Sequence, residues 1–397
     1  MISEKMISLV KNSSVIRAMF EEGKRLAGIY GAENVFDFSI GNPNVAAPAD
    51  VNEAIRHIID AEESVTVHGY MNNSGFEDVR KAIADSINRK HNTDFDENNI
   101  IMTVGAAGGM NVVFKALLNP GDEVMVIAPF FGEYRSYAAN VDASLVVVPP
   151  NIPSFQPDLE SFEKLITART RIVVINTPNN PTGVIYSEKT LKAMADILER
   201  KQKEFGTQIV LFSDEPYREL AYDNKVVPYV THFYKNTIIG YSYSKSLSLP
   251  GERIGYLVIP SEMAEFEDVC SACNVATRIL GYVNAPSLMQ KVVAECVDVD
   301  ITENVAIYNR NREALYKGLL DAGFECVKPE GAFYMFVKTP VDDGEFAERA
   351  KKYNILVVPG KSFGCPGYVR IAYCVAYDTI INSLPKFKEL GRELGLN

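Results

Sequence analysis

The sequence contains no tryptophan and only four histidines among its 397 residues. The histidines form neither an H-x-x-H nor an H-E-x-x-H pattern; they are His57, His68, His91 and His232. The six cysteines are spread thinly, and the one C-x-x-C, formed by Cys270 and Cys273, has no second Cys or His pair at zinc spacing. We therefore expect no metal site. We also expect reduced thiols, because a chain of this length needs no disulfide staples.

Basic residues are fewer than acidic residues, and long apolar runs are absent from the sequence. Lys and Arg together number 40 against 51 Asp and Glu, which gives a formal net charge of -11. This balance argues against a nucleic-acid partner, because phosphate binding needs clustered basic side chains. No run of about 18 apolar residues is present, so we expect no membrane span. Residues 1–27 are typical of an amphipathic helix rather than a signal peptide, and we expect a cytoplasmic protein.

Seven short apolar runs follow one another from about residue 98. They cover residues 99–104, 123–128, 144–149, 171–176, 208–213, 237–242 and 255–260. The runs are rich in β-branched residues and alternate little between apolar and polar, which is typical of strands buried on both faces. Helical stretches lie between them, such as residues 187–206, which begin at a Ser cap and end at Gly206. This order predicts an α/β large domain, residues 46–285, with a mainly parallel seven-stranded sheet covered by helices.

The pattern changes near residue 290. One long helix is expected over residues 286–322, followed by fewer strands and separate helices. This pattern predicts a smaller α+β domain. We expect both chain ends to build it, from residues 1–45 and 286–397.

The most informative segment is Y-S-Y-S-K-S-L-S-L-P-G-E-R-I-G, residues 241–255. Lys245 lies at the end of a predicted strand, where α/β sheets bind ligands. A lysine that is desolvated near another cation, here Arg253, can lose its proton and form a Schiff base. Ser242 and Ser244 offer hydroxyls to a phosphate, and Arg253 offers a bidentate guanidinium. A solvated loop lysine would explain an isolated S-x-S-K equally well, so the other motifs decide.

Three further segments also follow predicted strands. The glycine-rich T-V-G-A-A-G-G-M-N, residues 103–111, leads into a helix whose free N–H groups favour an anion. Asn180, in N-T-P-N-N-P-T-G, places an amide donor at a fixed turn, although turn chemistry alone could explain it. Asp214 and Tyr217 follow in F-S-D-E-P-Y. A buried carboxylate needs a partner, and a protonated pyridine nitrogen would supply one.

Arg370 is a lone arginine in the apolar segment Y-V-R-I-A-Y. A salt bridge within the core would explain such a residue. The carboxylate of a substrate would satisfy it equally well.

The order and spacing of these segments resemble the class I/II aminotransferases of the aspartate aminotransferase superfamily (fold-type I), over essentially the whole chain. The resemblance implies a pyridoxal-phosphate enzyme in which Lys245 binds the cofactor and moves the substrate proton. Asp214 matches the partner of the pyridine nitrogen, and Asn180 and Tyr217 match the donors to its 3′ oxygen. The resemblance places the phosphate in a cradle with these members: Gly105, Ala106, Ala107, Ser242, Ser244 and Arg253.

Four more roles are implied by the same resemblance. Phe131, in A-P-F-F-G-E-Y, matches the ring that stacks on the pyridine, although a core Phe would look the same. Tyr70, in H-G-Y-M-N-N-S-G, matches a tyrosine that reaches the phosphate of the neighbouring subunit. Arg370 matches the clamp on the substrate α-carboxylate, with the Gly41 backbone beside it. The family implies ping-pong transamination between an amino acid and a 2-oxo acid, in a homodimer with shared active sites.

The substrate side chain is less constrained by the sequence. One aspartate-using subgroup carries a Lys at the position of Ala107, and this chain lacks it. Another subgroup uses an Arg from the partner subunit in R-x-x-Y-x-N-P, and R-I-L-G-Y-V-N-A-P, residues 278–286, is similar but one residue longer. We hypothesise that Arg278 reaches the neighbouring site and selects aspartate or glutamate, with 2-oxoglutarate as the acceptor. A surface arginine is the competing interpretation.

Other functions share most of these motifs. An aromatic or alanine aminotransferase is compatible with the same residues, and so is a pyridoxal-phosphate-dependent C–S β-lyase. A regulator that uses such a domain as a sensor would need an added DNA-binding module, for which we expect no room in this acidic chain of 397 residues.

Overall fold

The computed structural model describes residues 1–11 and 15–396. Its centre is a seven-stranded sheet in the order β2-β8-β7-β6-β5-β3-β4. The strands are β2 (Ile100–Thr103), β3 (Glu123–Ile127), β4 (Ser144–Val148), β5 (Thr170–Asn176), β6 (Val210–Asp214), β7 (Thr237–Ser242) and β8 (Gly255–Val258). Strand β8 runs antiparallel to both of its neighbours, β2 and β7, and the other strand pairs of this sheet are parallel. The predicted mainly parallel sheet and all seven of its strands are confirmed.

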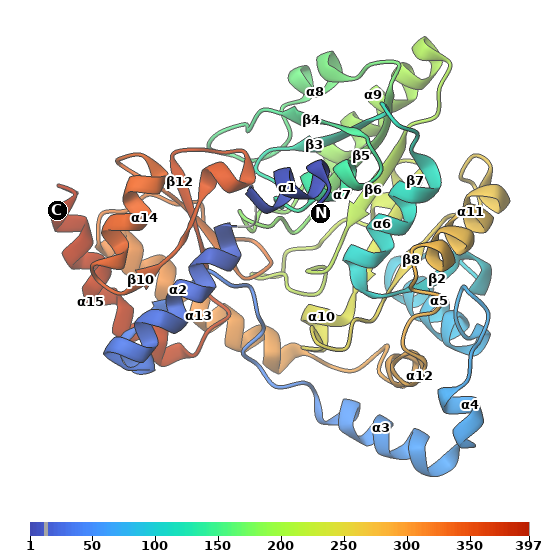
Figure 1. Ribbon diagram of the computed structural model, residues 1–397, viewed down its shortest axis with the longest axis horizontal. Helices are drawn as coiled ribbons and strands as arrows, with labels where there is room; N and C mark the ends of the chain where they lie inside the picture. Colours follow the sequence, from blue (N-terminus) through green and yellow to red (C-terminus); the bar gives the residue numbers. More distant parts are fainter. Residues whose placement is uncertain (12–14, 397) are drawn as a thin grey trace.

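Helices cover both faces of this sheet (Figure 1). One face packs on α6 (Gly105–Leu117), α7 (Tyr134–Asn140) and α11 (Phe266–Ile279). The other face packs on α8 (Leu159–Leu165) and α9 (Glu188–Phe205). At the β2 end it meets α3 (Ala49–Ala61), α5 (Glu77–His91) and α12 (Ser287–Glu295). Because the sheet is buried on both sides, its strands are apolar almost throughout, as the sequence pattern indicated.

The ends of α9 illustrate how local sequence sets an element. The Ser187 side chain accepts a hydrogen bond from the backbone N–H of Thr190, which caps the first turn. Gly206 ends the helix in the left-handed conformation, with φ 64°. Both ends lie where the sequence predicted them.

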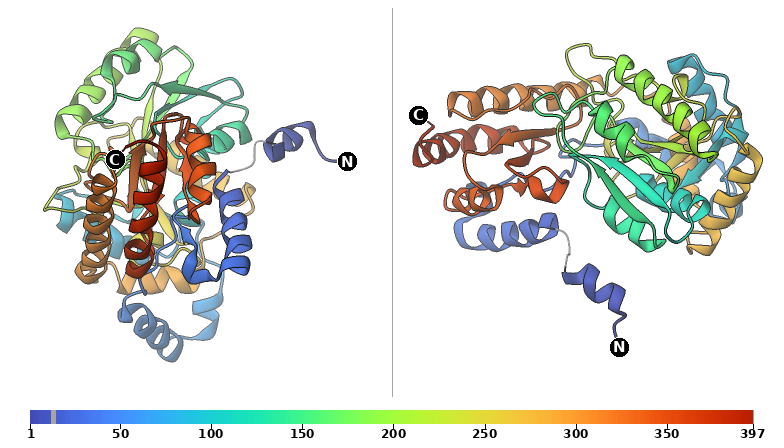
Figure 2. Two further views of the ribbon diagram at one scale, coloured as in Figure 1. Left: turned by 90° about the vertical axis from the view of Figure 1, so that its left-hand side faces the viewer. Right: turned by 90° about the horizontal axis from the view of Figure 1, so that it is seen from above.

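A second body contains a three-stranded antiparallel sheet in the order β11-β12-β9. Its strands are β9 (Tyr334–Lys338), β11 (Val358–Pro359) and β12 (Tyr368–Ala372), and β1 (Phe36–Asp37) pairs in parallel with β10 (Ile355–Leu356) beside it. The helices here are α2 (Val15–Tyr30), α13 (Thr302–Asp321), α14 (Asp343–Lys351) and α15 (Tyr377–Glu393). Helix α1 (Glu4–Lys11) projects from the main body (Figure 2). Segments from both ends of the sequence, α2 with β1 and residues 302–396, thus build this part, and residues 12–14 of the predicted N-terminal helix lie outside the described residues.

The prediction of one helix over residues 286–322 is wrong. The structure has α12 and α13 instead, separated at residues 296–301. Asp300 accepts hydrogen bonds from the backbone N–H and hydroxyl of Thr302, which begins a new helix there. Asp298 is drawn toward α5, where it accepts a hydrogen bond from Ser86. Because α12 packs on α3 and α5, we propose that the domain boundary predicted at residue 286 belongs nearer residue 296.

The remaining short elements connect these parts. They are α4 (Ser64–His68), α10 (Tyr243–Ser246) and the 3-10 turns η1 (Ala32–Asn34), η2 (Glu97–Asn99), η3 (Val230–His232) and η4 (Gly360–Phe363). Within the described part of the chain, no helix is long and apolar enough to cross a membrane.

Candidate active site

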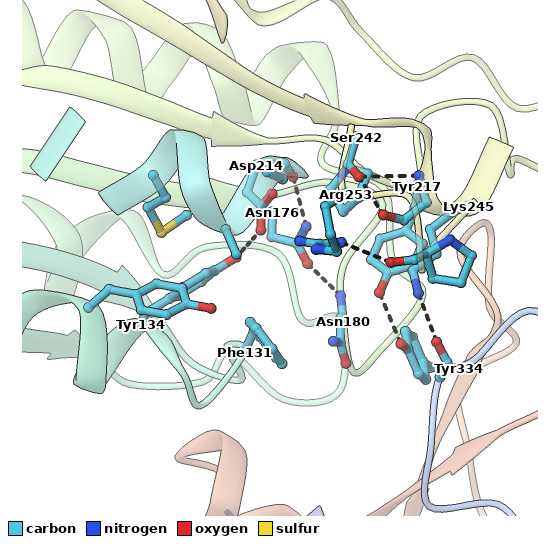
Figure 3. A pocket seen from close by; sticks show the side chains of 18 of the residues that line it. Phe131, Tyr134, Asn176, Asn180, Asp214, Tyr217, Ser242, Lys245, Arg253 and Tyr334 are labelled. Carbon is cyan, nitrogen blue, oxygen red and sulfur yellow. Dashed lines mark hydrogen bonds between the residues drawn. The ribbon is translucent and has the colours of Figure 1, made fainter. Parts of the chain in front are cut away.

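A cavity of about 270 Å³ lies at the carboxyl ends of β6 and β7 and extends to β9 and β12. It brings together twelve of the fifteen residues that the sequence assigned to the site. These are Gly41, Ala106, Ala107, Phe131, Asn180, Asp214, Tyr217, Ser242, Ser244, Lys245, Arg253 and Arg370. Figure 3 shows side chains that line this cavity, among them those of Asp214, Lys245 and Arg253. Carboxyl ends of strands carry such sites because parallel strands all end at the same edge.

Lys245 lies in α10, directly after β7, and points into the cavity. Its Nζ donates a hydrogen bond of 2.8 Å to the carbonyl oxygen of Gly41 and lies 5.3 Å from the ring centre of Phe333. Burial, together with the positive charges of Arg370 and Arg253, lowers the pKa of Lys245 to about 8. The amine is therefore much easier to deprotonate than an ordinary lysine, as a nucleophile or base requires.

Asp214 ends β6 and is buried, with 8% of its surface exposed. One carboxylate oxygen, Oδ2, accepts a hydrogen bond of 2.6 Å from the hydroxyl of Tyr134. The other, Oδ1, has no hydrogen-bond partner among the described residues. Burial raises the pKa of Asp214 to about 7, and the Tyr134 bond opposes this rise. A protonated ring nitrogen in the cavity would satisfy Oδ1, so the observed geometry fits a pyridine cofactor.

Two amides and a phenol line the wall beside Asp214 (Figure 3). Asn176, the last residue of β5, accepts from the backbone N–H of Asn180 at 2.6 Å and donates to the carbonyl of Asp214 at 2.8 Å. It thereby fixes the ends of two neighbouring strands relative to each other. The Tyr217 hydroxyl lies 2.9 Å from that of Tyr334. Asn180 and Tyr217 are thus both held where they can donate to a polar oxygen in the cavity.

The start of α6 and the loop around Arg253 form an anion cradle. Gly105 has φ 68°, and a Cβ at this position would lie 2.5 Å from Nη2 of Arg253. The glycine therefore lets the guanidinium approach the helix start. Ser242 and Ser244 lie beside it, with their hydroxyl oxygens 2.6 Å apart. Helix N–H groups, two hydroxyls and a guanidinium are the donors that a phosphate group requires.

Arg370 lies in β12 and is 2% exposed. Its Nη2 donates to the carbonyl of Ser39 at 2.5 Å, and its Nη1 donates to the side-chain oxygen of Asn180 at 3.1 Å. Nε has no partner, and no acidic side chain pairs with this guanidinium, in the part of the chain that the structure describes. A buried cation without a counter-ion is costly, so a substrate carboxylate fits better than a structural salt bridge.

The other three residues have different positions. Gly105 lies directly behind the cavity wall, as part of the cradle. Tyr70 is 92% exposed, and Arg278 is exposed in the last turn of α11. Neither lines the cavity of its own chain. Their segments are nevertheless joined, because Asn73 donates to the carbonyl of Val283 and Asn284 donates to that of Asn72, both at 2.9 Å.

Four residues of the cavity that carry polar groups were not predicted from the sequence, namely Tyr134, Tyr137, Asn176 and Tyr334. Tyr134 and Asn176 lie in segments quoted above for other residues, such as A-P-F-F-G-E-Y for Tyr134. Asn176 directly precedes T-P-N-N-P-T-G at a strand end, and this position was a usable signal. Tyr334, in G-A-F-Y-M-F-V, looks like an ordinary strand tyrosine.

Comparison with known proteins agrees with this geometry. Residues 33–380 match the family described as aminotransferase class I and II. The aspartate aminotransferase of Pyrococcus horikoshii is 31% identical, over 98% of this chain and 96% of that protein. The aromatic-amino-acid aminotransferase 2 of Thermococcus litoralis is 28% identical, with 96% of each chain covered. A crystal structure of an amino transferase from Eubacterium rectale is 45% identical, with a TM-score of 0.96 over 99% of each chain.

The chain belongs to the class I and II aminotransferases. It is an enzyme of the α/β class that depends on pyridoxal phosphate and catalyses amino-group transfer.

Proposed function

We propose that this aminotransferase acts on aspartate or glutamate with 2-oxoglutarate as acceptor, as a cytoplasmic homodimer in which each subunit lends Tyr70 and Arg278 to the other. One observation carries the proposal: both side chains are exposed on segments that hydrogen bonds join. Apolar side chains are exposed around them, including Val65, Ile279 and Leu280. A second copy of the chain would cover such a surface. Free thiols at all six cysteines agree with a reducing compartment.

The proposed binding mode of the cofactor is based on the hydrogen-bonding groups that line the cavity. The α6 start, Ser242, Ser244 and Arg253 bind the phosphate. Oδ1 of Asp214 would accept a hydrogen bond from the protonated ring nitrogen. Asn180 and Tyr217 would donate to the 3′ oxygen, and Phe131 would pack against the ring. Tyr70 of the other subunit completes the phosphate site.

The proposed reaction divides the work between two side chains. When bound, pyridoxal phosphate supplies an electron sink for the negative charge that develops on the substrate α-carbon. Arg370 binds the α-carboxylate and fixes the substrate beside Lys245. The neutral amine of Lys245 then takes the α-proton, as its lowered pKa of about 8 allows. Water supplies the keto oxygen of the first 2-oxo acid, which leaves while the amino group remains with the enzyme. A second 2-oxo acid then receives the amino group in the reverse sequence, and water is released.

Replacement of Arg278 tests the substrate preference. We expect Arg278→Ala to lower kcat/KM for aspartate about 100-fold, because a charged hydrogen-bonded pair contributes about 3 kcal/mol. The kcat/KM for alanine or phenylalanine should change less than about threefold. Arg392→Ala is the matched control, since Arg392 also lies exposed in the last turn of a helix. Unchanged aspartate kinetics would refute the role of Arg278, and preferred turnover of phenylalanine would favour the aromatic alternative. Release of ammonia and 2-oxo acid without an acceptor would instead identify a β-lyase.

Mixed dimers test whether Arg278 acts across the subunit boundary. A mixed dimer contains one Lys245→Ala chain and one Arg278→Ala chain. If Arg278 acts on the partner's site, the Arg278→Ala chain keeps a complete site, with its own Lys245 and the Arg278 of the other chain. Random exchange makes half of the dimers mixed, so aspartate activity should recover to about a quarter of wild type. If Arg278 acts within its own chain, mixing will restore nothing.

A further inference from the structure

Tyr334, the first residue of β9, contacts three residues of the site at once. Its hydroxyl lies 2.9 Å from the hydroxyl of Tyr217. Its ring centre lies 4.6 Å from Cζ of Arg370. A Cβ on Gly41 would overlap its hydroxyl, so this contact requires a glycine. Gly41 in turn accepts the hydrogen bond of Lys245. The side chain of Tyr334 therefore contacts Tyr217, which is assigned to the cofactor, and Arg370, which is assigned to the substrate carboxylate. It also packs against Gly41, which binds Lys245.

The protonation states of Tyr217 and Tyr334 indicate which of the two hydroxyls donates in the hydrogen bond between them. Burial raises the pKa of Tyr334 to about 12 and that of Tyr217 well above its usual range, so both phenols stay protonated near neutral pH. A phenol donates one hydrogen bond. If Tyr217 donates its proton to the 3′ oxygen of the cofactor, then its own oxygen is free to accept. Tyr334 is then the donor in the bond between the two hydroxyls.

The ring of Tyr334 has a separate task. The Arg370 guanidinium lies over two aromatic rings, with its Cζ 4.6 Å from the centre of Tyr334 and 5.0 Å from that of Phe363. Aromatic faces attract a guanidinium and stabilise it without using its N–H groups. These donors then remain available for Ser39, Asn180 and a carboxylate.

We propose that Tyr334 is a positioning residue for transamination, and that its two ends act separately. The hydroxyl donates to Tyr217 and directs the Tyr217 proton toward the 3′ oxygen of the cofactor. The ring holds the guanidinium of Arg370 in place for the α-carboxylate. This inference rests on the proposed roles of Tyr217 and Arg370.

Two substitutions separate the two ends. Tyr334→Phe removes the hydroxyl and keeps the ring, whereas Tyr334→Leu removes both. The first readout is the pH midpoint of the visible absorbance change of the cofactor-loaded enzyme. Weaker donation to the 3′ oxygen leaves more negative charge there, which holds a nearby proton more tightly. We expect Tyr334→Phe to raise this midpoint by about 0.5 pH unit, which is the size of one lost neutral hydrogen bond.

The second readout is the Kd of two non-reactive carboxylates, succinate and 3-phenylpropionate, measured from the same absorbance. Tyr334→Phe should leave both within about twofold of wild type, since the ring still covers Arg370. Tyr334→Leu should raise both by about fivefold or more. Tyr234→Phe is the control for loss of a buried tyrosine hydroxyl, because Tyr234 donates to the carbonyl of Ile209 away from the cavity. It should change neither readout.

Tyr217→Phe and Arg370→Lys separate this inference from the proposed function. If Tyr217→Phe raises the midpoint and Tyr334→Phe does not, the role of the Tyr334 hydroxyl is refuted. If neither variant moves the midpoint, the role of Tyr217 is refuted together with it. If Arg370→Lys weakens carboxylate binding but Tyr334→Leu does not, the role of the ring is refuted. Equal loss of carboxylate binding in Tyr334→Phe and Tyr334→Leu would contradict the separation of the two ends.

Discussion

The hydroxyl of Tyr134 donates a hydrogen bond of 2.6 Å to Oδ2 of Asp214, while Oδ1 of the same carboxylate has no partner among the described residues. The buried carboxylate is therefore only half satisfied. Such a group costs free energy in the cofactor-free protein, because burial penalises its charge. The cofactor's ring nitrogen would remove that cost. The fold thus favours cofactor binding, because binding relieves an unfavourable interaction of the cofactor-free protein.

Asp214→Asn should stabilise the cofactor-free protein, and the gain should grow with pH. The folded pKa of about 7 lies above the ordinary value of 3.8. The folded state therefore holds a proton that the unfolded chain has lost, and the free energy of unfolding falls as pH rises from about 4 to 7. Asparagine carries no charge and can still accept from Tyr134. We expect its advantage over wild type to increase by about 2 kcal/mol between pH 5 and pH 8.

Urea unfolding of the cofactor-free protein at pH 5 and pH 8 measures this difference. The control is Asp60→Asn, because Asp60 is exposed on α3. Its effect should be the same at both pH values. An Asp214→Asn advantage that shrinks with pH would contradict the raised pKa.

The rate at which the cofactor-free enzyme captures pyridoxal phosphate covalently should follow the deprotonation of Lys245. Only the neutral amine is a nucleophile, and burial lowers the pKa of this lysine to about 8. The rate should rise about tenfold per pH unit below this value and level off above it. Stopped-flow absorbance between pH 6 and pH 10 gives the profile, and Lys245→Ala should show no capture. A rate that continues to rise up to pH 10 would mean that Lys245 behaves as an ordinary lysine.

Much of the site could be predicted from the sequence because its motif residues lie at the ends of predicted strands. Lys245, Asp214 and Asn180 each follow an apolar run directly, and the ends of parallel strands meet at one edge. The helix pattern gave α9 with both of its caps for a similar local reason. These assignments depend on residues within a few positions of one another.

Two of the missed residues, Tyr134 and Tyr334, depend on contacts between distant segments. Tyr134 is 80 positions from Asp214, and Tyr334 is 117 positions from Tyr217. No local pattern pairs them, and either tyrosine would suit a buried aromatic position equally well. The break between α12 and α13 depends likewise on Asp298, which α5 binds through Ser86. Tyr70 and Arg278 are a different case, because their proposed role needs a second copy of the chain.

Gly105→Ala should lower the affinity for pyridoxal phosphate, and Gly206→Ala provides a matched control. Both glycines are left-handed, with φ 68° and 64°, so alanine strains the backbone similarly at each and should cost about 1 kcal/mol of stability. Their surroundings differ. A Cβ on Gly105 would lie 2.5 Å from Arg253, whereas a Cβ on Gly206 would meet nothing within 4 Å. The displaced guanidinium should raise the Kd for pyridoxal phosphate about tenfold in Gly105→Ala alone, because a charged hydrogen bond to an anion contributes about 1.5 kcal/mol or more. Equilibrium dialysis gives this Kd, and urea unfolding gives the stability. Equal losses of cofactor affinity in the two variants would show that backbone strain, rather than the contact with Arg253, controls phosphate binding.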